Sequence, residues 1–114
     1  MQHKTLTRHA QTLVQRIQEL DRALAECGGE AYRGCWLDSA TNRTGKRYTR
    51  LRWFTSHQPK RKGCRILKGE ELATATRAIA LWQERDTAAA QLEATQQQIE
   101  AIEHQASALG LRVS

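Results

Sequence analysis

The first 27 residues place apolar and small side chains at a regular helical spacing. From Leu6 to Cys27 these positions are separated by alternating steps of four and three residues, as in the seam of a coiled coil. Gly28 and Gly29 follow, and glycine readily adopts the left-handed conformation that ends a helix. The pattern predicts a first helix over about residues 5–27. Its seam is formed by Leu6, Ala10, Leu13, Ile17, Leu20, Leu24 and Cys27.

Residues 31–68 have another pattern, in which strand-favouring runs are separated by turn-forming residues. Residues 42–45 predict one turn. The stretch "SHQPKRKG", which contains the only proline, predicts a second turn, and the following "CRIL" is expected to form a short strand. Together these signals predict a three-stranded antiparallel meander.

Within this meander the alternation of side chains predicts two unlike faces. Leu51 and Trp53 alternate with Arg50 and Arg52, which is the period-two pattern of a half-buried strand. One face is therefore expected to pack inward while the other carries arginine. A β-bulge would transfer a side chain to the opposite face. Tyr48 and Phe54 are expected on the arginine side, and Trp36 and Trp53 in the core beneath the meander.

A second helix is predicted over residues 70–109, about 60 Å long at 1.5 Å per residue. Its apolar positions change phase near Arg85, which implies different packing partners for its two halves. In one arrangement, residues 70–90 pack on the first helix and the sheet, and the distal half pairs with another subunit. In the other, the proximal half covers the sheet and the distal half meets the first helix. The first stripe is Leu72, Ala75, Ile79 and Trp82; the second is Leu81, Ala88, Leu92, Thr95, Ile99, Ile102, Ala106 and Leu109.

These elements predict an α+β fold, mainly α, in which two long coiled-coil-type helices flank a small three-stranded antiparallel meander. The 114 residues are expected to form a single domain. Because the second helix is much longer than the first and bulky apolar residues are few, we expect a homodimer that pairs through its helices.

Charge is strongly segregated along the chain. Residues 31–68 contain eleven Lys or Arg and a single acid, Asp38, for a net charge of +10, whereas the remaining seven basic and eleven acidic residues give −4. A local positive field of this kind attracts polyanions.

The basic meander therefore predicts nucleic-acid binding, with duplex DNA as the favoured form. Lys and Arg would neutralise phosphates, and a narrow sheet can enter the major groove, where arginine bonds guanine. Aromatic side chains on the same face could stack unpaired bases instead. The predicted site comprises Arg33, Arg43, Lys46, Arg47, Tyr48, Arg50, Arg52, Phe54, Lys60, Arg61, Lys62, Arg65 and Lys68.

Three other interpretations of this charge remain open. The chain could be a coiled-coil adaptor whose basic meander docks an acidic protein partner. RNA could replace DNA as the polymer. The charges could also solubilise an exposed face or protect a sheet edge.

Other classes of function find little support. Three cysteines cannot form a complete disulfide framework, and Cys27, Cys35, Cys64 and His57 lack zinc-knuckle spacing, so we expect neither a metal nor another cofactor. Cys35 and Cys64 are instead expected to lie buried in neighbouring strands. Without a carboxylate pair or a phosphate-binding loop, an enzyme is not expected. The absence of a signal sequence and of a membrane span predicts a cytoplasmic protein that does not act at a membrane.

The stretch "KRYTRLRWFTSHQPKRKGCRILKGEELATATRAIALWQ" resembles the arm-type DNA-binding domain of tyrosine integrases, over about residues 31–85. In that family a three-stranded sheet followed by a helix inserts into the major groove. The resemblance implies that Arg50 and Arg52 face the groove. The chain is also similar to small bacterial proteins in which a basic β-hairpin joins two helices.

Overall fold

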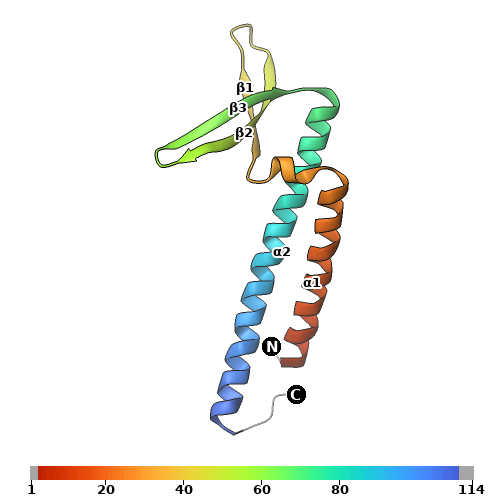
Figure 1. Cartoon of the computed structure of the whole chain (residues 1–114), viewed down its shortest axis with the longest axis vertical. Coiled ribbons are helices and arrows are strands. Elements are labelled where there is room, and N and C mark those ends of the chain that lie inside the picture. The colour runs from red at the N-terminus through yellow and green to blue at the C-terminus, as the bar shows by residue number, and fades with distance from the viewer. Residues whose placement is uncertain (1–2, 111–114) are drawn as a thin grey trace. The chain divides into compact units, whose positions relative to one another are not determined.

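The computed structural model describes residues 3–110 and shows two long helices and a three-stranded sheet (Figure 1). The expected α+β class, mainly α, is confirmed, and the two helices begin and end within two residues of their predicted limits. Coiled-coil geometry stays a prediction. The elements are α1 (His3–Glu26), the short 3-10 helix η1 (Gly29–Tyr32), β1 (Trp36–Thr41), β2 (Arg47–His57), β3 (Lys60–Leu67) and α2 (Gly69–Ala108).

The chain divides into two compact units, and α2 contributes to each of them. One unit contains α1 up to Arg22 together with α2 from Glu84 onward. The other is continuous from Ala23 to Gln83 and contains the sheet with the first part of α2.

In the helical unit, α1 and the distal part of α2 are held together by ion pairs along their length. His3 Nε2 lies 2.8 Å from Glu103 Oε1, and Arg16 Nη2 lies 3.0 Å from Glu84 Oε1. The order of these contacts makes the two helices antiparallel, as Figure 1 shows. The distal half of α2 therefore meets α1, as the second of the two arrangements predicts. The homodimer stays a prediction.

The burial of side chains in this unit follows the predicted seams. Leu6, Leu13 and Leu20 of α1 are buried, as are Ala88 and Thr95 of α2. Leu109, in contrast, is 67% exposed because α2 has already ended at Ala108. Part of each apolar stripe is thus covered within one chain, while Ile17, Ile99 and Ile102 stay half-buried.

In the other unit, the sheet has the strand order β1-β2-β3, with antiparallel neighbours. Leu51 of β2 and Leu67 of β3 form a core with Ala75 and Ile79 of α2. Leu37, Trp53 and Leu72 also pack against this core. Three members of the first predicted stripe of α2, Leu72, Ala75 and Ile79, therefore lie beneath one face of the sheet. Burying these apolar side chains is what fixes the face that the sheet turns to α2.

The third strand is longer than the sequence predicts, and the second turn is shorter. β2 continues to His57 and β3 begins at Lys60, so only Gln58 and Pro59 separate the two strands. Lys60, Arg61 and Lys62 therefore belong to a strand and not to a loop. Because β3 is an edge strand, its long cationic side chains can remain in solvent while its backbone pairs on one side only.

The register of the strands also corrects the predicted positions of Trp36 and two cysteines. Trp36 is the partner of Arg52, which places its ring on the arginine side and not in the core. Cys64 is exposed on β3, and Cys35 precedes β1 on the other side of β2, so these two residues do not lie in neighbouring strands. Trp53 and Trp82 are packed as predicted, and Trp82 Nε1 donates a hydrogen bond to the Gly29 carbonyl at 2.8 Å.

Candidate nucleic-acid interface

The two faces of the sheet follow from the alternation along β2 and from the strand register. We define the inner face as the side of Leu51 and Trp53, which packs on α2. The opposite side we call the outer face. It carries Trp36, Asp38, Tyr48, Arg50, Arg52, Phe54, His57, Lys60, Lys62, Cys64 and Ile66.

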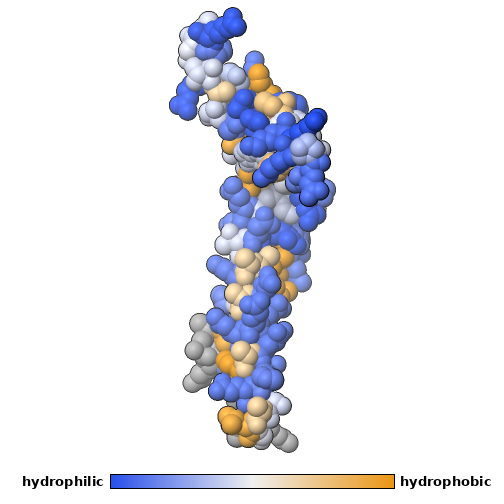
Figure 2. Space-filling model, turned by 90° about the vertical axis from the view of Figure 1, so that its left-hand side faces the viewer, coloured by the Kyte–Doolittle hydropathy of each residue, from blue (hydrophilic) through white to orange (hydrophobic). Residues whose placement is uncertain are grey.

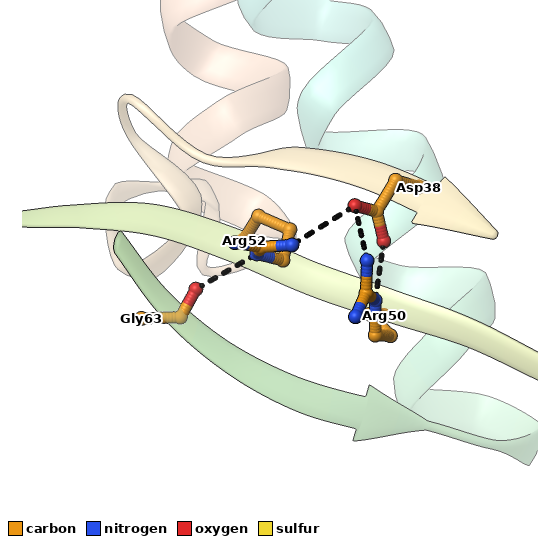
Figure 3. A network of polar contacts seen from close by, with 4 residues as sticks. All are labelled: Asp38, Arg50, Arg52 and Gly63. Atoms are coloured by element: carbon orange, nitrogen blue, oxygen red, sulfur yellow. Dashed lines mark hydrogen bonds and ion pairs between the residues drawn. The ribbon is translucent and has the colours of Figure 1, made fainter. Parts of the chain in front are cut away.

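At the centre of the outer face, two arginines donate hydrogen bonds to the same carboxylate, that of Asp38 (Figure 3). Arg50 donates from Nε to Asp38 Oδ1 at 2.8 Å and from Nη2 to Oδ2 at 2.9 Å. Arg52 donates from Nη1 to Asp38 Oδ2 at 3.2 Å and from Nε to the Gly63 carbonyl at 3.2 Å. The network thereby links all three strands.

This network alters the charge that the outer face presents. The hydrogen bonds from Arg50 hold the pKa of Asp38 below its usual value, and the Asp38 carboxylate raises the pKa of Arg50. The Asp38 carboxylate offsets one of the two guanidinium charges, so the network carries a single net positive charge. Four guanidinium N–H groups are already used, which fixes the two side chains in place.

Beside the network, three rings form what we call the aromatic cluster: Trp36, Phe54 and His57. The ring centroids of Trp36 and Phe54 are 5.0 Å apart at an interplanar angle of 47°, and those of Phe54 and His57 are 5.3 Å apart at 42°. Trp36 and Phe54 are half-buried and His57 is exposed. Such tilted pairs are a favourable arrangement of aromatic rings.

Two lysines of β3 lie over the cluster. Lys60 Nζ is 4.8 Å from the centroid of Phe54, and Lys62 Nζ is 5.9 Å from that of Trp36. These side chains are exposed, and a cation over a ring at an exposed site contributes about 0.5–1 kcal/mol. Base stacking on an aromatic ring contributes roughly 1–3 kcal/mol, so a base can displace such a lysine.

A β-bulge completes the aromatic cluster. The pairing of β2 with β3 shifts register between Phe54 and Ser56, and this shift leaves Thr55 without a partner. In a regular strand, residues 54 and 57 would point to opposite faces. The extra residue returns His57 to the side of Phe54, which explains their ring contact.

The remaining cations fall into a paired and an unpaired set. Arg33 lies 3.6 Å from Glu30, and Arg65, which occupies the inner face, contacts Glu71 in the first turn of α2. Seven other basic residues of the predicted site are exposed and have no carboxylate within ion-pair distance among residues 3–110. They are Arg43, Lys46, Arg47, Lys60, Arg61, Lys62 and Lys68.

The predicted site residues gather in three places. Arg50, Arg52, Phe54, Lys60 and Lys62 are brought together on the outer face. A hollow of about 560 Å³ beside β2 is lined by Arg33 and Arg65 together with Phe54 and His57. Cys35 also lines it, and burial raises the pKa of its thiol. A second hollow of about 660 Å³ is lined by Lys46, Arg47, Tyr48 and Lys68.

The turn between β1 and β2 holds Arg43 at its tip. Asn42 Oδ1 accepts hydrogen bonds from the backbone N–H groups of Thr44 and Lys46, at 3.0 and 2.9 Å. Gly45 adopts φ +83°, a conformation that favours glycine. These turn-forming residues were recognisable in the sequence. The turn that they form carries Arg43 and Lys46.

Sequence reasoning missed Trp36, Asp38 and His57 as components of the site. For Asp38 a signal existed, because it is the only acid among eleven basic residues. Trp36 could be assigned to the outer face only from the register that places it opposite Arg52. The place of His57 beside Phe54 depends on the bulge, which no local pattern in the sequence specifies.

No family model, curated protein or solved structure matches the chain. Within residues 3–110 no group of three or more His, Cys, Asp or Glu side chains is arranged to hold a metal ion. The described helices also lack the combination of length and apolar character that crossing a membrane requires.

Proposed function

We propose that this protein is a non-enzymatic nucleic-acid-binding protein that contacts its ligand through the outer face of the sheet. The observation that carries this proposal is the aromatic cluster with Lys60 and Lys62 over its rings. Rings supply surfaces for bases, and lysines supply charge for phosphates, so one small area offers contacts to both parts of a nucleotide.

The distribution of charge supports a polyanionic ligand. Among residues 3–110, eleven exposed Lys and Arg residues have no carboxylate within ion-pair distance. Seven of them lie between Arg43 and Lys68, in the turns, β2 and β3, and the other four lie in the two helices. Hydrophilic residues also dominate the visible surface of the strands (Figure 2). Each cation that neutralises a phosphate releases condensed counterions, so affinity should fall steeply as salt is raised.

Duplex DNA, the form favoured from the sequence, would be contacted by inserting the sheet into the major groove. Arg50 uses one N–H group of Nε and one of Nη2 on Asp38, which leaves the N–H groups of Nη1 and the second one of Nη2 for a bidentate contact with guanine. The exposed lysines would add phosphate contacts to duplex DNA, and these carry little sequence preference. The helices are proposed to serve for dimerisation or for docking a partner.

The proposal is tested by fluorescence anisotropy with labelled duplex and single-stranded 20-mers, across a series of salt concentrations. We compare Lys60→Glu/Lys62→Glu with Lys4→Glu/Arg8→Glu, which makes the same change in net charge on exposed positions of α1. At about 50 mM salt, the first variant should weaken binding by roughly tenfold or more, and the second by less than about threefold.

Equal losses in the two variants would mean that net charge alone attracts the polymer and would overturn the assignment to the outer face. If the unsubstituted protein binds neither polymer at about 50 mM salt, the proposal is wrong. An acidic protein partner would then be the next candidate.

A further inference from the structure

We infer that the aromatic cluster binds unpaired bases, so that the preferred ligand is a single-stranded nucleic acid. This inference rests on the proposed function and specifies the ligand of the same site. It differs from the expectation of duplex DNA, because it assigns the recognition to ring faces and not to arginine donors.

The first reason is the position of Trp36 and Phe54 on the outer face, away from the core. The core formed with α2 lies on the inner face, where Trp53 is the packed aromatic ring. Trp36 and Phe54 contact each other and the lysines of β3, and they remain half-buried. Large rings in such a position offer apolar surface to a ligand.

The second reason is the geometry of the rings. Because the planes of Trp36 and Phe54 are inclined by 47°, they cannot hold one base in a parallel sandwich between them. Each ring must instead offer its own outer face to a separate base. The centroid separation of 5.0 Å suits two successive bases of a strand that bends across the cluster.

The third reason is the exchange that Lys60 and Lys62 can make. Their long side chains are exposed, and their ammonium groups lie over the rings that a base would occupy. When a base stacks there, each ammonium group can swing to a flanking phosphate. The ammonium group thereby exchanges a weak contact with a ring for an ion pair with a phosphate, and no buried group loses its partner.

A duplex cannot use the cluster in this way. Its base faces are stacked on one another inside the helix, and only the base edges are open to a protein in the grooves. Stacking also makes no use of the 2′-hydroxyl group. Single-stranded DNA and RNA of the same length should therefore bind within about threefold of each other.

The decisive experiment uses the full chain, labelled dT12 and U12, and a 12-base-pair duplex at one salt concentration. We expect dT12 to bind roughly tenfold more tightly than the duplex and to quench tryptophan fluorescence. Trp36→Phe should retain dT12 binding within about threefold, because phenylalanine still stacks, but should abolish the quench. Trp53 packs against the inner-face core and Trp82 donates a hydrogen bond to the Gly29 carbonyl, so neither belongs to the aromatic cluster and neither should respond.

A second variant tests the cluster without relying on tryptophan emission. Phe54→Leu keeps an apolar side chain but removes the aromatic face, and should weaken dT12 binding by roughly tenfold while changing duplex binding by less than about twofold. The matched control is Val14→Ala, which shortens an exposed apolar side chain on α1 and should leave dT12 binding unchanged. Circular dichroism verifies that each variant is folded.

The outcomes separate this inference from the proposed function. If dT12 binds without quenching, or if folded Phe54→Leu binds both polymers as the unsubstituted protein does, the aromatic cluster does not bind bases. Salt-dependent binding that is lost in Lys60→Glu/Lys62→Glu would still support the proposed function. If the unsubstituted protein binds none of these polymers, both proposals are wrong.

Discussion

The inner and outer faces of the sheet are built from alternate residues of the same strands, yet they are stabilised in different ways. On the inner face Leu51 and Leu67 are buried against Ala75 and Ile79 of α2. On the outer face the side chains are held by ion pairs and ring contacts within the sheet, and Ile66 is 53% exposed. Neighbouring residues of one strand thus experience different environments.

This difference suggests a division of labour between the faces. The inner face removes apolar surface from water and provides the free energy of folding. The outer face adds less to stability and leaves rings and cations available to a ligand. Substitutions on the inner face should therefore change stability, and substitutions on the outer face should change binding.

The largest expected effect is that of Leu51→Ala. Leu51 is 4% exposed at the centre of the core, and truncating such a side chain lowers the free energy of unfolding by about 2–5 kcal/mol. Urea denaturation followed by circular dichroism measures this loss. The outer-face control, Ile66→Ala, should stay within about 0.5 kcal/mol of the unsubstituted protein. Equal effects in the two variants would contradict the difference between the faces.

A smaller loss of stability is expected for Gly63→Ala. A Cβ atom at Gly63 would overlap the indole ring of Trp53, so the ring must move from its place on the inner face. Overpacking of this kind costs about 1–3 kcal/mol. Combined with Trp53→Leu, the same substitution should cost much less, because the atoms that clash are gone. Additive effects of the two substitutions would exclude this explanation.

The smallest effect is expected for Asp38→Asn, and it concerns binding. The substitution removes the outer face's only acid and releases Arg50 and Arg52 from it. Affinity for dT12 at about 50 mM salt should rise roughly two- to fivefold, and the salt dependence should steepen by about 0.7 in the log–log slope. Glu71→Gln, which removes the partner of Arg65 on the inner face, should change binding less. Weaker binding by a folded Asp38→Asn variant would mean that the ligand needs the arginines in their fixed positions.

The pH dependence of stability provides an independent test of the interaction between Asp38 and Arg50. The pKa of Asp38 is lowered in the folded protein, chiefly by its hydrogen bonds to Arg50. The stability that this interaction adds is therefore fully present above the ordinary carboxyl pKa of about 3.9. It is lost as the pH falls through the lower, folded value. Below pH 4 the unsubstituted protein should lose more stability than Asp38→Asn, as measured by urea denaturation at each pH.

Features that depend on residues close together in the sequence were predictable, whereas features that depend on distant residues were not. The helix limits and the turn at Asn42 were predictable because spacing, glycine and side-chain-to-backbone hydrogen bonds act over a few residues. The alternation of Leu51 with Arg50 likewise predicted the two faces of β2. The extension of β3 back to Lys60 was not predictable, since its cationic residues resemble a loop until they are paired with β2.

The sequence by itself thus determined the elements, the charge segregated in residues 31–68 and the two faces of the central strand. Only the tertiary structure decided that Trp36 lies opposite Arg52, that Asp38 holds two arginines and that a bulge returns His57 to Phe54. It also decided that the distal half of α2 meets α1. The physical reason is that local periodicity specifies which face a side chain takes, whereas register and helix pairing depend on contacts between residues far apart in the chain.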